Sequence, residues 1–302
     1  MHAAMLETIA EFLIVGLVIG GIYALFAIGI TLIFGVLDVI NTAHGEFFAI
    51  GGYLAFLGIV TLQMHPFLGV VAAVAGSFAL GLALYPLLIA PLRNRLGRRP
   101  SGPTFLVLTL GLSTFLQSML VAIAGGDYLR VPPYVRGMLD LQFTAVSHQR
   151  ILIFIVATLT LAALFAFLRW HRQGMAIRAV AMNPDAAQSV GVNLALVFTL
   201  TLALGVGLAG LAGALIAPVF SVYPAVGFAL TIKAFAITIL GGMGNVMGAL
   251  VASFFIAVVE ALAVIWIPSE WQNMIAFAVM VIVLLVRPQG LFGRPLAQAD
   301  RG

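Results

Sequence analysis

Five ionisable side chains lie within or beside long apolar runs, where they could take part in moving an ion or a polar solute. Three cluster at one polar break and two lie in later runs: Asp38, His44, Glu46, Lys233 and Glu260. Each costs about 2.5–3.5 kcal/mol to insert into a bilayer, so such groups normally face a bundle interior or a cavity. They could form a proton or ion relay, or they could line a path for a solute.

The break between the first two apolar runs, residues 37–46 (LDVINTAHGE), allows two interpretations. It is either an aqueous loop with solvated side chains or an unwound segment within the membrane that lines a path. In the second interpretation, Asn41, His44 and Glu46 belong to a translocation pathway, and Glu46 could form an ion pair with Lys233.

A second irregular stretch, residues 233–250 (KAFAITILGGMGNVMGAL), interrupts a later apolar run with glycines. The glycines either break the helix or only allow close helix packing, for which Gly244 and Gly248 have suitable spacing. One interrupted run in each half of a chain points to a transport site near the bilayer midplane. The expected translocation pathway therefore also includes Lys233, Gly241, Gly242 and Gly244.

Several catalytic motifs are excluded by the sequence. Lys233 is the one lysine and follows Ile232, so no G-x-x-x-x-G-K-[ST] loop for binding ATP is present. The chain also lacks cysteine, a His-Glu-x-x-His pair and a G-x-S-x-G elbow. We therefore expect a non-catalytic chain that itself binds no cofactor and no metal.

The composition predicts that lipid is the main solvent of the elements that carry these residues. The 302 residues are 63% hydrophobic and 8% charged, which no soluble fold of this size could accommodate. We expect one integral membrane domain, residues 1–302, with an all-α polytopic bundle of about eight to nine spans. One short run, 229–240, either crosses through the glycines or is re-entrant. The eight full spans are expected near 12–36, 47–62, 67–90, 104–123, 151–168, 194–217, 249–266 and 273–286.

Basic residues predict the orientation, because loops rich in Lys and Arg stay in the cytoplasm. If 229–248 crosses the membrane once, the alternation of spans places three segments with ten arginines on one side of the membrane. Three arginines lie on the other side. The N-terminus is then outside and the C-terminus is cytoplasmic. Because the positive charges are confined to short loops between spans, they do not indicate binding to nucleic acid. The inner group is Arg93, Arg95, Arg98, Arg99, Arg169, Arg172, Arg178, Arg287, Arg294 and Arg301, and the outer group is Arg130, Arg136 and Arg150.

The cytoplasmic loop 169–193 contains a short helix with clear end signals. Asn183 can cap its N-terminus, Pro184 suits the first helical position and Asp185 suits the positive end of the helix dipole. Gly191 is expected just past the C-terminal end. Because the chain has no nucleotide-binding motif, the energy for transport must come from another protein. We expect that protein to contact and move this helix.

Several stretches together resemble the permease subunits of branched-chain amino acid ABC importers. They are 16–53 (GLVIGGIYALFAIGITLIFGVLDVINTAHGEFFAIGGY), 233–262, the cytoplasmic end RPQGLFG (287–293) and the loop 174–193. DAAQSVG (185–191) fits the importer pattern Glu-Ala-Ala-x-x-x-Gly with Asp185 in place of Glu, whereas the longer Ile-x-Leu-Pro ending is absent. The short N-terminus and INTAHGE are more similar to the first, H-type, subunit.

The resemblance implies an inner-membrane subunit that pairs with a second related permease. It also implies two cytoplasmic subunits that bind ATP and an extracytoplasmic substrate-binding protein. The cargo would be branched-chain or other amino acids, amides or urea, and Ala186 and Ala187 would let the ATPase approach closely. An ion- or proton-coupled secondary transporter that uses Asp38, Glu46, Lys233 or Glu260 is the alternative. The expected coupling residues are Asn183, Pro184, Asp185, Ala186, Ala187 and Gly191.

Overall fold

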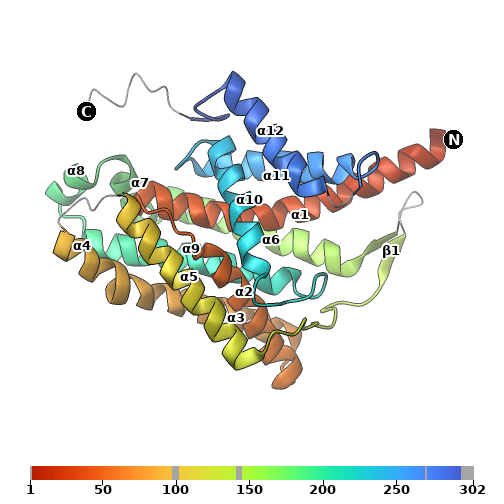
Figure 1. The fold of residues 1–302 in the computed structure, drawn as a ribbon, viewed down its shortest axis with the longest axis horizontal. Coiled ribbons are helices and arrows are strands. Elements are labelled where there is room, and N and C mark those ends of the chain that lie inside the picture. Colours follow the sequence, from red (N-terminus) through yellow and green to blue (C-terminus); the bar gives the residue numbers. More distant parts are fainter. Residues whose placement is uncertain (1, 97–101, 141–144, 269–270, 294–302) are drawn as a thin grey trace.

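Helices make up most of the structure (Figure 1), a computed structural model that describes residues 2–96, 102–140, 145–268 and 271–293. Two π-helical turns continue helices, and one short antiparallel hairpin is present. The elements are α1 (His2–Leu37), α2 (His44–Phe56), η1 (Leu57–Thr61), α3 (Pro66–Leu84), η2 (Tyr85–Ile89), α4 (Ala90–Leu96), α5 (Gly102–Ala124), β1 (Met138–Asp140), β2 (Ala145–Ser147), α6 (His148–Trp170), α7 (Arg172–Met182), α8 (Pro184–Ser189), α9 (Leu194–Ile216), α10 (Val226–Gly241), α11 (Val246–Ala263) and α12 (Gln272–Val286).

The spans agree with an all-α polytopic membrane bundle. Seven helices in the described part of the chain are long and apolar enough to cross a bilayer, and α10 and α12 are shorter apolar helices. The expected span 273–286 corresponds to α12, a shorter apolar helix of 15 residues with a length of about 22 Å. The run 229–240 begins earlier than expected, at Val226, and forms a helix of 16 residues. Neither short helix alone covers the roughly 30 Å of a bilayer's hydrocarbon core.

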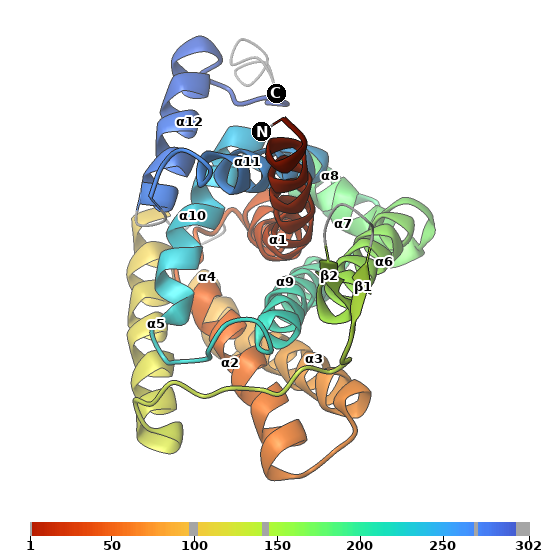
Figure 2. The ribbon, with the colours of Figure 1, turned by 90° about the vertical axis from the view of Figure 1, so that its right-hand side faces the viewer.

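α1 runs through the middle of the bundle, and α9, α10 and α11 surround it (Figure 2). Its glycines set the distance to α11, because a Cβ at Gly16 would lie 2.9 Å from the Cα of Val258. A Cβ at Gly20 would likewise lie 2.7 Å from the Phe254 ring. Small residues at crossings allow this close packing without a hydrophobic driving force.

Glycines also fix how α2 sits among its neighbours. A Cβ at Gly45 would collide with the Gly227 carbonyl of α10, and a Cβ at Gly51 would collide with the Gly210 backbone of α9. The two crossings hold α2 against α9 on one side and α10 on another. The start of α2, which carries His44 and Glu46, is therefore placed by direct contacts between backbones.

The two ends of the bundle differ in their elements and charges. α4, α7 and α8 lie at one end, and the N-terminal part of α1 and the β1–β2 hairpin lie at the other (Figure 1). Arg93, Arg169 and Pro288 line one cavity, which confirms that the three basic segments share an end. Four arginines of the predicted inner group, Arg98, Arg99, Arg294 and Arg301, lie outside the described residues.

At the opposite end, the connection between α5 and α6 is pinned to the bundle. The Tyr134 hydroxyl donates to the Ala214 carbonyl of α9 at 2.6 Å, and burial raises the pKa of Tyr134. The backbone N–H of Tyr134 donates to Gln149 Oε1 at 2.8 Å. The first bond holds the connection against the end of α9, and the second holds it against the start of α6.

Candidate translocation path and coupling helix

The backbone leaves helical geometry between α1 and α2. Asp38 lies in the left-handed region with φ +56°, which is uncommon for a residue other than glycine. Arg93 of α4 donates from Nη2 to the Leu37 carbonyl at 3.0 Å, which satisfies one of the last carbonyls of α1. Asn41 Oδ1 accepts from the Ala43 N–H at 3.2 Å. The break is therefore held by specific hydrogen bonds. No sequence signal indicated that Arg93 would reach it.

Most polar residues of this break are buried, so the aqueous-loop interpretation was wrong for them. His44 is 0% exposed and Glu46 is 2% exposed, and Asn41 is also buried. Asp38 is exposed and lines a large cavity described below. The unwound part ends at Ala43, so His44 and Glu46 belong to the first turn of α2.

The His44 side chain packs against α1. Its Nε2 lies 3.2 Å from the Phe26 carbonyl, and because a carbonyl can only accept, Nε2 carries the proton. Nδ1 has no hydrogen-bond partner within the described residues. A Cβ at Gly29 would lie 2.9 Å from Nε2, so glycine makes room for the ring. The ring also packs against the rings of Phe26 and Phe47.

Lys233 pairs with Glu260, and the expected ion pair between Glu46 and Lys233 was wrong. Lys233 Nζ lies 2.8 Å from Glu260 Oε1 and donates to Tyr23 Oη at 2.9 Å. The Tyr23 hydroxyl in turn donates to Glu260 Oε2 at 3.0 Å. These three residues, the Lys233 triad, join α1, α10 and α11. Glu46 Oε1 instead accepts from Ser113 Oγ of α5 at 3.0 Å.

The glycine-rich stretch does break a helix, as one of the two interpretations proposed. α10 ends at Gly241, and positive φ angles follow at Gly242 (+100°) and Gly244 (+78°). Such angles suit glycine because it lacks a Cβ. Asn245 then caps α11 by accepting from the Gly248 N–H at 3.0 Å. Gly241 and Gly248 themselves touch across the turn, so the packing interpretation also holds locally.

The C-terminal segment 287–293 completes this second break. The Leu291 N–H donates to the Leu240 carbonyl at 2.7 Å, and the Phe292 N–H donates to the Gly241 carbonyl at 3.2 Å. Asn245 Nδ2 donates to the Phe292 carbonyl at 2.9 Å. The segment thereby satisfies carbonyls at the end of α10, a role that the sequence had not indicated.

Both breaks open onto one cavity, which we call the vestibule. A Cβ at Gly35, in the last turn of α1, would lie 3.1 Å from Gly244 Cα, so the breaks are neighbours. The vestibule has a volume of about 2110 Å³. Its walls join the breaks to the basic segments and the short helix through Asp38, Arg93, Arg169, Arg178, Pro184, Asp185, Gly244, Asn245, Pro288 and Phe292.

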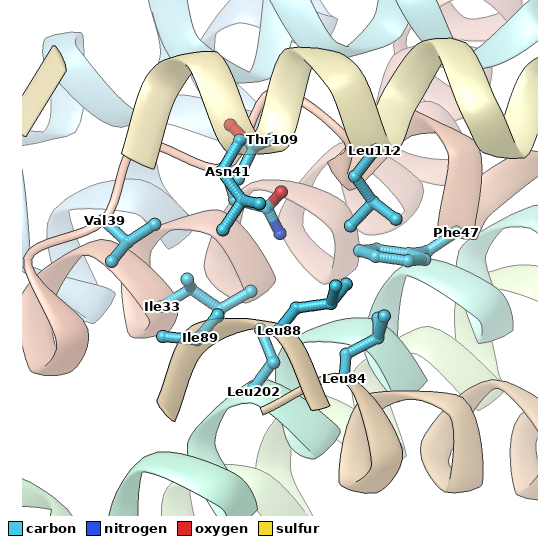
Figure 3. A pocket seen from close by; sticks show the side chains of 11 residues that line it. Ile33, Val39, Asn41, Phe47, Leu84, Leu88, Ile89, Thr109, Leu112 and Leu202 are labelled. Atoms are coloured by element: carbon cyan, nitrogen blue, oxygen red, sulfur yellow. The ribbon is translucent and has the colours of Figure 1, made fainter. Parts of the chain in front are cut away.

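A second, smaller cavity lies between the first break and α5 (Figure 3). Its volume is about 20 Å³, enough for about one water molecule. The Asn41 amide nitrogen points toward it, and the other side chains in view are mostly aliphatic (Figure 3). The lining residues are Ile33, Val39, Asn41, Phe47, Leu84, Leu88, Ile89, Leu108, Thr109, Leu112 and Leu202.

The short helix in 169–193 has the predicted end signals. Asn183 Oδ1 accepts from the Ala186 N–H at 3.0 Å, Pro184 is the first residue of α8, and Gly191 has φ +88°. The preceding part of the segment was expected to be a loop, but it forms α7. Gly174 is the third residue of α7, and glycine disfavours helix. The sequence therefore offers few signals of α7 beyond its His171 cap, which accepts from the Gln173 N–H at 3.2 Å.

The two alanines of α8 face different ways. Ala186 is exposed, which suits contact with a partner, but Ala187 is buried within this chain. The expectation that Ala187 lets a partner approach closely was therefore wrong, since its methyl group packs inward. Met182 and Val190 flank α8 and are 75% and 80% exposed. The sequence analysis missed this pair, because only the structure shows that these two apolar side chains are exposed.

These features together define a class of protein. Two broken helices, buried charges and a vestibule at one end describe a polytopic membrane transport protein. Among the residues that the structure describes, no group of three or more His, Asp or Glu side chains is placed to hold a metal ion.

Comparisons with known proteins identify the family. Residues 12–284 match the family described as "Branched-chain amino acid transport system / permease component". LivH of Escherichia coli K12, a high-affinity branched-chain amino acid transport system permease protein, is 33% identical over 93% of this chain and 94% of its own. BraD of Pseudomonas aeruginosa, described in the same words, is 33% identical over 94% of this chain and 95% of its own. The chain belongs to this family of membrane-spanning permease components.

Two further similarities are more distant. LivM of Escherichia coli K12, a permease protein of the same kind of system, is 26% identical over 89% of this chain and 67% of its own. A chain of PsaBC from Streptococcus pneumoniae, solved in complex with Fab, matches with a TM-score of 0.51 and 11% identity, covering 94% of both chains. At that identity the second likeness concerns the fold alone.

Proposed function

We propose that this chain is the membrane-spanning permease subunit of an ATP-driven importer of branched-chain amino acids across the inner membrane. The observation that carries the proposal is the placement of α8. This capped helix lies at the vestibule end with Met182 and Val190 exposed beside it. The chain lacks an ATP-binding loop of its own, so ATP is bound by partner subunits and this chain catalyses no reaction.

The expected assembly has four kinds of subunit. Similarity to both LivH and LivM supports pairing with a second, related permease. Two cytoplasmic ATP-binding subunits would contact α8, and an extracytoplasmic binding protein would deliver substrate at the opposite end. In this orientation the N-terminus is outside, the C-terminus is cytoplasmic and the vestibule opens inward, as the arginine distribution favours.

α8 can transmit motion because it is coupled to the bundle. Ala187 anchors it inward, and α7, to which it is joined, packs on α1 and α9. Closure of the ATPase pair would press on α8 and shift these helices as rigid bodies. The two breaks border the vestibule at the ends of α1 and α10, where such a shift would change the width of the path.

A reconstituted importer tests the proposal. The chain, its permease partner, the ATPase subunits and the binding protein are placed in proteoliposomes, and uptake of radiolabelled leucine is measured. We expect uptake that requires hydrolysable ATP and persists with a protonophore. Uptake that continues without ATP and collapses with the protonophore would instead identify an ion-coupled transporter.

A further inference from the structure

Among the residues that the structure describes, Glu46 and Glu260 are the buried acidic side chains, and their surroundings differ. Glu260 has a cation of its own, because Lys233 Nζ lies 2.8 Å from it. Glu46 is buried as deeply but receives one hydrogen bond, from the neutral Ser113 hydroxyl. Within the described residues, its second oxygen, Oε2, has no hydrogen-bond partner. The single lysine of the chain is already engaged, so it is not available to Glu46.

An unpaired carboxylate at this depth is costly, and the cost falls when a cation arrives or when the group binds a proton. Glu46 therefore offers a position for a positively charged group that enters from outside the chain. Ser113 orients the carboxylate by holding Oε1, which leaves Oε2 for the incoming group.

The surroundings of Glu46 indicate what else the ligand must carry. Ser113 lies one helical turn beyond Thr109, and Phe47 follows Glu46 on α2. Thr109 and Phe47 both line the small cavity of Figure 3. The cavity walls are mostly aliphatic, and Asn41 directs an amide nitrogen into it. A ligand that carries an ammonium group beside an aliphatic side chain fits these surroundings. Its ammonium group matches the Glu46 carboxylate, and its side chain matches the aliphatic cavity.

We propose that the seam between α2 and α5 is a subsite for an aliphatic amino acid, with Glu46 holding the ammonium group and the small cavity holding the side chain. The inference rests on the proposed function and adds residues to it. The cavity admits only about one water molecule, so the subsite must widen before an amino acid can enter. We place the opening movement on the α5 side of the cavity. In the described structure α5 packs mainly on α2, so few other helix contacts resist its movement.

The first test separates a charged Glu46 from a permanently protonated one. Glu46→Gln has the shape of the protonated acid but cannot attract an ammonium group. In the reconstituted importer we expect Glu46→Gln to lower maximal leucine uptake by about 10- to 100-fold, and Glu46→Asp to recover part of it. Assembly with the partner subunits and the thermal midpoint check that the variant is folded. Unchanged uptake in folded Glu46→Gln would overturn the subsite.

The second test changes the cavity wall. Leu112 lines the cavity from α5, so Leu112→Phe should narrow it and Leu112→Ala should widen it. We expect Phe to shift the leucine-to-valine uptake ratio toward valine and Ala toward leucine, each by about three- to fourfold per methylene. Leu110→Phe is the matched control, because Leu110 is on α5 but is 44% exposed. Equal ratios in all three variants would also overturn the proposal.

Different results would overturn the proposed function and the subsite. A wild-type importer with no ATP-driven uptake of leucine or valine would remove the proposed function itself. Normal wild-type uptake, together with variants that behave like wild type, would remove the subsite alone.

Discussion

The ammonium group of Lys233 lies 2.8 Å from the carboxylate of Glu260, and the two residues come from the helices on either side of the glycine break. Lys233 is on α10 and Glu260 is on α11, and the Tyr23 hydroxyl bridges both to α1. The ion pair therefore fixes the hairpin that contains the break and attaches it to the central helix. We interpret Lys233 as a positioning residue, which makes it a poor candidate for direct substrate contact.

Removing one partner of this pair should cost more than removing both. Lys233→Met leaves Glu260 buried without its cation, at a cost of about 3–5 kcal/mol. The double variant Lys233→Met, Glu260→Met leaves no unpaired charge, so we expect a thermal midpoint between the single variant and wild type, or above. The measurement is thermal unfolding of the detergent-solubilised protein. A double variant less stable than either single variant would show that the pair does not act as a unit.

Gly191 should be needed for its backbone angle and for nothing else. A Cβ at Gly191 meets no atom within 4 Å, but φ is +88°, where an L-residue costs about 1–2 kcal/mol. We expect Gly191→Ala to loosen the end of α8 and to lower ATP-driven uptake about fivefold or more. Gly111→Ala is the control, because Gly111 also has open space but lies within α5. Equal uptake by the two variants would contradict this reasoning.

Variants at the two alanines of α8 should distinguish an effect on binding of the ATPase subunits from an effect on folding. Ala186→Arg places a charge on an exposed position, so we expect an unchanged thermal midpoint but weak binding of the ATPase subunits in a pull-down. Ala187→Arg buries a charge, so we expect a lower midpoint, by several degrees or more, before docking is considered. If Ala187→Arg unfolds at the wild-type temperature, the inward packing of α8 described above is incorrect.

The contact between α2 and α10 should tolerate no added methyl group. A Cβ at Gly227 would collide with the Gly45 backbone, so Gly227→Ala must push the helices apart, at about 1–3 kcal/mol. Gly207→Ala serves as the comparison, because its Cβ would meet Phe78 at an ordinary 3.4 Å. Thermal unfolding should show a clear loss for the first variant and little change for the second. A loss of similar size in both would point to a general effect of alanine.

Features that depend on local signals could be predicted from the sequence. Apolar length located the main spans, and Asn183, Pro184 and Gly191 marked α8 correctly, because caps and turns act over a few residues. Both breaks were also placed correctly by their polar or glycine content.

Features that depend on contacts between distant residues could not be predicted. The sequence suggested Glu46 as the partner of Lys233, and only the packing of α10 against α11 places Glu260 beside it. The same holds for Arg93 at the end of α1 and for the inward face of Ala187. The proposed roles of the pathway and coupling residues stay predictions until the variants are measured.

The hydrogen bonds from Leu291 and Phe292 to the end of α10 also have a consequence for biosynthesis. Translation proceeds from the N-terminus, so α10 is made some fifty residues before its partners. Until then the Leu240 and Gly241 carbonyls lack these bonds. The second break therefore reaches its final form only after nearly the whole chain has been inserted, and truncation before residue 291 would leave it incomplete.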